Sequence, residues 1–222
     1  MIQVFNYSIF EATPIIGIVR NIPQHTVLEI LPRYLAAGLT TIEITMNSPE
    51  ALSIIRQAVK YFGKTLNIGA GTVCQTSELD AALDAGAAFI VTPIIDSDVV
   101  LRCKQHGVPI FPGATTPTEV YHAWKLGATM VKLFPAESLG AKYIQSLRGP
   151  FPHIPLLATG GINIDHLQGY WSAGVEGFGI GSPLFPSKLV KERDWQALEK
   201  HFVAYASRMK ELVSSGKEKI GI

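Results

Sequence analysis

The sequence contains few of the residues that mark metal, redox and membrane proteins. Its 222 residues include only two cysteines, Cys74 and Cys103, and no CxxC pair. This spacing indicates neither a disulfide framework nor a zinc site. The six histidines are scattered without HxH or HxxxH spacing, so no metal site is expected. No apolar run approaches the ~20 residues that a membrane-spanning helix needs.

Strong charge and targeting signals are also missing. The formal net charge is +1, and no basic block indicates a partner nucleic acid or a membrane surface. The N-terminus lacks the basic start and the apolar run of a signal peptide. Hydrophobic residues make up 47% of the chain and charged residues 17%, a balance that predicts a folded core and excludes disorder. We therefore expect a soluble protein of the cytoplasm.

What the chain does contain is a repeated unit of helix end, glycine and short buried strand. The unit recurs four times, at residues 37–44, 85–91, 126–132 and 173–179. Its glycines are spaced by about 41 to 48 residues, which is roughly two strand–helix units. Further strand-like runs lie between the repeats and before them, at 15–19, 66–69, 108–111 and 156–159. The pattern therefore predicts eight strands.

Helical patterns separate the strands. They cover residues 25–37, 49–62, 76–85, 97–106, 117–126, 140–147, 164–173 and 194–214. Pro49 and Pro117 are each expected at a first helical position, which proline favours. Residues 1–14 form a leading segment before the first strand, and residues 214–222 a frayed tail.

Eight alternations of strand and helix predict an α/β fold with a closed, eight-fold β/α barrel of the TIM type. The length suits one domain spanning residues 1–222. The alternative is an open, doubly wound sheet. Its dinucleotide fingerprint GxGxxG is absent after the first strand, where the sequence reads Gly17-Ile18-Val19-Arg20.

One predicted strand, residues 129–135, places a lysine among apolar residues. Side chains alternate along a strand, so Lys132 shares a face with Met130 and Phe134. If both faces are covered, Lys132 is desolvated, its pKa falls and its amine can act as a nucleophile. The alternative is a lysine whose stem packs while its head reaches water. Taken alone, this strand favours the second interpretation.

The second predicted strand shifts that balance. Ile42, Ile44 and Met46 share one face, while Glu43 and Thr45 share the other and point into the barrel. A buried ion pair that only fills the core is expensive and often no more stable than apolar packing. An amine and a carboxyl near the active rim therefore indicate Schiff-base chemistry, in which the carboxyl transfers protons.

Glycine pairs follow the seventh and eighth strands. Backbone N–H groups of Gly160, Gly161, Gly181 and Ser182 could converge on a phosphate at the standard barrel position. The alternative is a set of tight turns without a ligand.

The combination of motifs resembles one family, the 2-keto-3-deoxy-6-phosphogluconate (KDPG) and 4-hydroxy-2-oxoglutarate (KHG) aldolases, with which 2-keto-3-deoxy-6-phosphogalactonate (KDPGal) aldolases are grouped. The resemblance covers roughly residues 10–210. It rests on Gly69-Ala70-Gly71-Thr72-Val73, Pro112-Gly113-Ala114-Thr115-Thr116-Pro117, Lys132-Leu133-Phe134-Pro135-Ala136, Gly149-Pro150-Phe151-Pro152 and Thr159-Gly160-Gly161-Ile162.

This resemblance implies a class I aldolase, a carbon–carbon lyase without metal or other cofactor, assembled as a homotrimer. The expected reaction cleaves KDPG to pyruvate and D-glyceraldehyde 3-phosphate, and KHG to pyruvate and glyoxylate. Lys132 matches the Schiff-base lysine and Glu43 the general acid/base. The remaining matches are Thr72, Pro93, Phe134 and Thr159 for the pyruvate-derived part, and Gly160, Gly161 and Ser182 for the phosphate.

One position departs from the KDPG enzymes. They commonly read Glu-Val-Thr-Leu-Arg-Thr on the second strand, whereas this chain has Asn47 at the place of the arginine. Asparagine cannot make a charge-assisted fork to a carboxylate, so Arg20 is expected to supply the charge. The Asn47-Ser48-Pro49 run looks more like KDPGal aldolases, which makes that activity the first alternative. A sugar-phosphate epimerase-like barrel and a binding barrel without turnover are the others.

Overall fold

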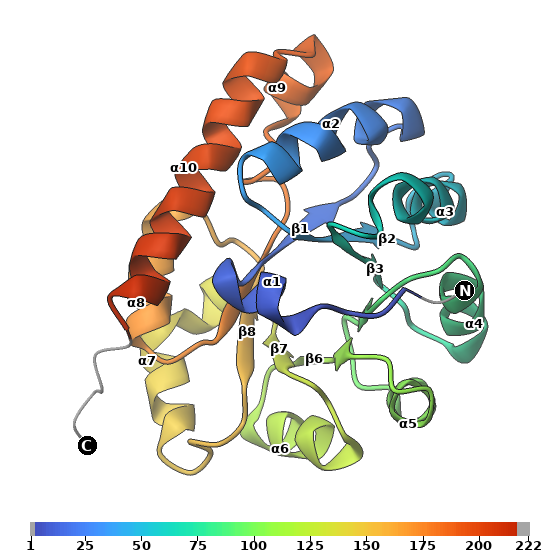
Figure 1. Cartoon of the computed structure of the whole chain (residues 1–222). Helices are drawn as coiled ribbons and strands as arrows, with labels where there is room; N and C mark the ends of the chain where they lie inside the picture. The colour runs from blue at the N-terminus through green and yellow to red at the C-terminus, as the bar shows by residue number, and fades with distance from the viewer. Residues whose placement is uncertain (1–2, 217–222) are drawn as a thin grey trace.

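The computed structural model describes residues 3–216, and its parallel strands form the centre of the molecule. The strands are β1 (Ile15–Val19), β2 (Thr41–Thr45), β3 (Asn67–Gly71), β4 (Ile90–Val91), β5 (Ile110–Phe111), β6 (Gly113–Ala114), β7 (Val131–Leu133), β8 (Leu156–Thr159) and β9 (Gly177–Ile180). Their order is β5-β4-β3-β2-β1-β9-β8-β7-β6. Figure 1 shows them as a ring with helices outside it.

The first and last strands in this order, β5 and β6, are joined through one proline. β5 and β6 are separated only by Pro112, which has no N–H group to donate. On one side, Thr92 N donates to the carbonyl of Phe111 at 3.2 Å. On the other side, Lys132 N donates to the carbonyl of Pro112 at 2.9 Å. β5 and β6 are thus two pieces of the predicted fifth strand, and the eight-fold barrel is confirmed.

The helices surround the ring. They are α2 (Gln24–Ala36), α3 (Ala51–Phe62), α4 (Thr76–Asp84), α5 (Ser97–Gln105), α6 (Pro117–Leu126), α7 (Ala136–Arg148), α8 (Leu167–Ser172), α9 (Ser187–Glu192) and α10 (Trp195–Ser214). A 3₁₀ turn, η1 (Ile164–His166), precedes α8 where one continuous helix was predicted. Among residues 3–216, no helix has the length and apolar character needed to cross a membrane.

Of the two prolines predicted at the first position of a helix, one lies there and the other does not. Pro117 is the first residue of α6, where Thr116 and Glu119 form a capping box. The expectation for Pro49 is wrong, because α3 begins at Ala51. Glu50 there has a left-handed backbone, with φ of 58°, which prevents the helix from starting earlier.

The leading segment closes the N-terminal mouth of the barrel. It contains a short helix, α1 (Tyr7–Ala12), which lies across the ring in Figure 1. Asn67, at the start of β3, accepts from Asn6 N at 2.7 Å and donates to Asn6 O at 2.9 Å. Of the predicted tail, Ser214 belongs to α10, and residues 217–222 lie outside the described residues.

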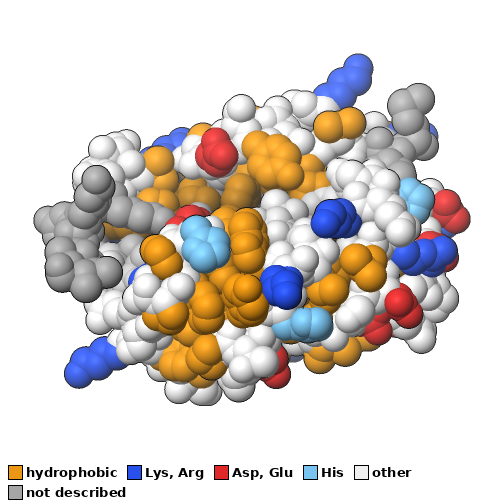
Figure 2. Space-filling model, turned by 90° about the horizontal axis from the view of Figure 1, so that it is seen from below, with side chains coloured by type: hydrophobic (Ala, Val, Ile, Leu, Met, Phe, Trp, Pro, Cys, Tyr) orange, Lys and Arg blue, Asp and Glu red, His pale blue; other side chains and the backbone are white. Residues whose placement is uncertain are grey.

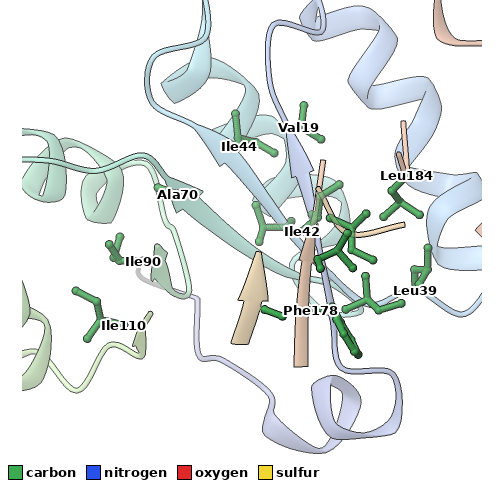
Figure 3. Close-up of a cluster of buried hydrophobic side chains, with 14 of the residues drawn as sticks. Val19, Leu39, Ile42, Ile44, Ala70, Ile90, Ile110, Phe178 and Leu184 are labelled. Carbon is green, nitrogen blue, oxygen red and sulfur yellow. The ribbon is translucent and has the colours of Figure 1, made fainter. Parts of the chain in front are cut away.

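Two layers of apolar side chains hold the barrel together. The larger layer lies between strands and helices, and Figure 3 shows part of it, including Ile42 and Ile44 of β2. The smaller layer fills the barrel interior towards α1 and includes Phe10, Phe89 and Phe111. Because both faces of the strands are covered, a polar side chain on an inner face is withdrawn from bulk water.

Candidate active site

A cavity of about 830 Å³ opens at the carboxyl ends of the strands. Its wall contains all eleven residues that the sequence suggested for the site. They are Arg20, Glu43, Thr72, Pro93, Lys132, Phe134, Thr159, Gly160, Gly161, Gly181 and Ser182. These residues lie within or just after seven different strands, so it is barrel closure that gathers them.

Lys132 lies in the middle of β7 and only 6% of it is exposed. Its backbone pairs with Gly113 on one side and Leu157 on the other, which holds the side chain on the inner face. Its Nζ atom lies 5.0 Å from the centre of the Phe134 ring. Burial lowers the pKa of the Lys132 amine; the positive charge of Arg20 adds to this, and the Glu43 carboxylate opposes it. A free amine in such a place can attack a carbonyl carbon.

Glu43 lies on β2 and is 2% exposed. Room for its carboxyl comes partly from Gly71 on β3, where any Cβ would collide with it. Burial raises the pKa of Glu43 to about 7, against the opposing effect of the positive charges of Lys132 and Arg20. Within residues 3–216 every salt bridge involves an arginine, and neither Glu43 nor Lys132 belongs to one. The two are therefore not a closed ion pair that fills the core.

Arg20 follows the last residue of β1 and reaches towards the end of β3. Its Nη2 atom donates to Thr72 Oγ1 at 3.1 Å. Thr72 has φ of 58°, a left-handed conformation that is costly for a β-branched residue and often marks a functional site. Asn47 is exposed and does not line the cavity. Arg20 is thus the arginine that this cavity contains.

Another part of the cavity wall is formed by the turns after β8 and β9, and β9 is the strand next to β1. Gly160 and Gly161 both have positive φ, of 95° and 73°. A side chain at Gly161 would collide with that of Glu137. Next to them, Thr159 is 3% exposed and its Oγ1 atom is buried without a hydrogen-bond partner. A buried hydroxyl that lacks a partner in the protein is available to a bound molecule.

One charged residue of the cavity wall, Lys191, is not among those predicted from the sequence. Lys191 lies on α9, which follows Pro186 and is only six residues long. A helix of that length is too short to show a hydrophobic period, so no helix was predicted there. The proline before Ser187 was the available signal, since barrels often place a short extra helix after the last strand.

The buried carboxyl of Glu43 predicts a pH dependence of stability. Its pKa is raised from 4.5 to about 7, so the folded chain keeps a proton that the unfolded chain loses. Rising pH between these values therefore lowers the free energy of unfolding. Glu43→Gln removes this effect, so the stability of the variant relative to the wild type should increase steadily from about pH 5 to pH 7.

The measurement is urea unfolding of both proteins across this pH interval. Glu192→Gln, at an exposed position on α9, serves as the control and should follow the wild type. A stability difference for Glu43→Gln that stays constant with pH would contradict the assigned pKa shift.

Comparison with known proteins places this geometry in one family. The family described as KDPG and KHG aldolase matches residues 7–201. The 2-dehydro-3-deoxy-6-phosphogalactonate aldolase of Escherichia coli is 35% identical over 193 residues, which cover 86% of this chain and 94% of that protein. The 2-dehydro-3-deoxy-phosphogluconate aldolase of Pseudomonas aeruginosa is 33% identical over 188 residues, 84% of each chain.

Solved structures agree. One described as native KDPGal has a TM-score of 0.84 at 32% identity and covers 90% of this chain and 96% of its own. The KDPG aldolase of Legionella pneumophila, with pyruvate captured as a covalent carbinolamine, has a TM-score of 0.83 at 25% identity and covers 89% and 96%. A designed cage built from symmetric oligomeric domains has a TM-score of 0.84 at 31% identity and covers 91% and 74%. The chain belongs to the KDPG and KHG aldolase family and is a carbon–carbon lyase.

Proposed function

We propose that this chain is a class I aldolase in which Lys132 forms a Schiff base with the ketone of a phosphorylated 2-keto-3-deoxy sugar acid. The observation that carries the proposal is the placement of Lys132, buried and with a lowered pKa, in one cavity with the buried carboxyl of Glu43. The carbinolamine captured in the Legionella relative supports it, because that adduct is the first covalent product of an amine and pyruvate.

The proposed reaction has two stages, which are formation of an imine at C2 and cleavage of the C3–C4 bond. The Lys132 amine attacks the C2 carbonyl carbon, and loss of water from the carbinolamine gives a protonated imine. A base then removes the proton of the C4 hydroxyl, the C3–C4 bond breaks, and its electron pair enters the imine to form an enamine. The aldehyde leaves, C3 takes up a proton, and water releases pyruvate and regenerates the amine.

Glu43 is the proposed acid and base for these proton transfers. With a pKa of about 7, its carboxyl is present in both protonation states near neutral pH. Arg20 is proposed to hold the substrate carboxylate by a charge-assisted fork. Thr72, Pro93, Phe134 and Thr159 would surround the pyruvate-derived carbons, and the turns containing Gly160, Gly161, Gly181 and Ser182 would bind the phosphate.

Borohydride reduction in the presence of pyruvate tests the Schiff base. Mass spectrometry of peptides should locate a reduced pyruvate adduct on Lys132, because among residues 3–216 only this amine is both buried and in the cavity with Glu43. Lys132→Ala should abolish the adduct. Lys188→Ala, an exposed lysine of α9, should retain it.

A folded wild-type protein that gives no adduct would contradict the aldolase mechanism. The result would then favour an epimerase-like barrel or a binding barrel that uses only the phosphate turns.

For the substrate we propose KDPGal as the preferred sugar acid, with KDPG as the second candidate. The relative at 35% identity is a phosphogalactonate aldolase, and the Asn47-Ser48-Pro49 run points the same way. This reverses the order expected from the sequence. KDPG stays a candidate because of the Pseudomonas relative and because the Gly149-Pro150-Phe151-Pro152 motif looks more like KDPG than KDPGal aldolases.

The two sugar acids differ only in configuration at C4, so their kcat/KM values decide. We expect kcat/KM for KDPGal to exceed that for KDPG, and both to exceed that for unphosphorylated KHG, with pyruvate release as the readout. The last comparison tests the phosphate turns, because KHG has no phosphate for them to bind. A kcat/KM for KDPG above that for KDPGal would restore the order expected from the sequence.

We further propose that the enzyme assembles as a homotrimer through the surface of α6 and the loop after α7. There Tyr121, 45% exposed, stacks on Phe151 with ring centres 5.7 Å apart. Trp124 lies against His153 at 6.2 Å. Figure 2 looks onto this lower edge of the molecule and shows hydrophobic side chains gathered across it. A partly exposed aromatic cluster of this kind is typical of a protein interface.

Light scattering tests the assembly. The wild type should give three times the 24.1 kDa of one chain. Tyr121→Glu should shift it towards the monomer, because burying a carboxylate in an apolar interface is costly. Tyr61→Glu, at a position 62% exposed on α3, is the matched control and should leave the mass unchanged. A monomeric wild type would contradict the proposal.

A further inference from the structure

The guanidinium of Arg20 depends on a turn for its position. The side chain is exposed, and its residue is the first after β1. The next residue, Asn21, has φ of 54°, a left-handed conformation that residues other than glycine adopt at a cost. Something outside the turn must therefore hold this backbone in place.

Ser48 makes that contact. The backbone N–H of Asn21 donates to Ser48 Oγ at 2.9 Å. The ladder between β1 and β2 ends at the pair Val19 and Ile44, so beyond it no strand carbonyl of β2 is opposite Asn21. The hydroxyl of Ser48 takes the place of such a carbonyl.

Ser48 is itself fixed to β2. It is 7% exposed, and its Oγ atom lies 2.8 Å from Oγ1 of Thr45, the last residue of the strand. Its backbone N donates to Thr45 O at 2.9 Å. Thr45 is fully buried and lies two residues after Glu43 on the same strand. The turn that bears Arg20 is thus tied to the strand that bears Glu43.

Arg20 is held at both ends. Its backbone adjoins the turn that Ser48 fixes, and its Nη2 atom donates to Thr72 Oγ1. The guanidinium then spans from β1 to β3 across the end of β2, beside the two buried ionisable groups whose pKa values it lowers. A loose turn would leave only the Thr72 contact, which an exposed arginine can lose to water.

We infer that Ser48 is a positioning residue that holds Arg20 in the geometry that binds the substrate carboxylate. Ser48 is not part of the cavity wall, so it acts only through the turn and not on the substrate. The inference rests on the proposed function, because that function supplies the keto-acid substrate whose carboxylate Arg20 binds.

The test compares Ser48→Ala with variants that separate positioning from stability. Ser48→Ala should raise KM for the keto-acid substrate by about tenfold, because an Arg20 that is no longer held in place loses part of its charge-assisted hydrogen bonding to the carboxylate. Its kcat should change by less than about twofold, because Lys132 and Glu43 stay in place. Ser48→Thr keeps the hydroxyl and should retain a KM near that of the wild type.

The matched control is Thr40→Ala. Thr40 Oγ1 donates to Ile9 O at 2.7 Å, just before the start of β2 and at the opposite mouth of the barrel. The control removes one hydroxyl contact near the same strand, so it should lower the melting temperature as Ser48→Ala does and leave KM unchanged. If Ser48→Ala does not fold, Ser48→Cys, of similar size and with a weaker hydrogen bond, takes its place.

A double-mutant cycle decides whether Ser48 works through Arg20. In an Arg20→Ala background, Ser48→Ala should raise KM by less than about twofold, because the group it positions is gone. An unchanged KM for Ser48→Ala alone, or an equal rise with and without Arg20, would overturn the inference. These outcomes are read in an enzyme that turns over, so they are distinct from the failure of the aldolase proposal, in which the wild type itself gives no pyruvate adduct.

Discussion

The withdrawal of two ionisable side chains from water is the constraint on which this site depends. Lys132 and Glu43 are 6% and 2% exposed, on strands that are covered on both faces. Burial disfavours the charged form of each, so it lowers the pKa of the amine and raises that of the carboxyl towards one another. Isolated burial of either charge would be expensive. Lys132 and Glu43 each limit that cost for the other, whereas Arg20 limits it for Glu43 and increases it for Lys132.

The barrel provides this environment because its sheet closes at Pro112 and because its N-terminal mouth is covered. Pro112 divides the fifth strand, yet its carbonyl accepts the backbone N–H of Lys132 and so fixes the residue on which the site is built. At the N-terminal mouth, α1 and the aromatic layer around Phe10 and Phe111 cover the interior. The open end is then the one at which the strand ends, their loops and the polar side chains meet.

Two residues at the rim of the site have backbone conformations that cost free energy. Asn21 and Thr72 both have left-handed backbones without being glycine, and both serve Arg20. Such conformations persist only where neighbouring contacts hold them. Ser48 provides one such contact, from a run that also carries the departure at Asn47. Asn47, which differs from the KDPG enzymes, and Ser48, which supports the turn of Arg20, are thus neighbours in the chain.

The sequence by itself determined the barrel and its strand faces, because a period of two fixes which side chains point inward. Alternation identified Lys132 and Glu43, whereas the resemblance to the family identified Thr72, Pro93, Phe134 and Thr159. The order of strands then fixes which ends share a rim. Only the tertiary structure decided the break at Pro112, the late start of α3, the presence of α9 with Lys191, and the contacts that orient Arg20. Arg20 and Thr72 are 52 positions apart, and Asn21 and Ser48 are 27 apart. Such contacts depend on loop conformation, which alternation along a strand does not encode, and on burial, which exists only once the ring has closed.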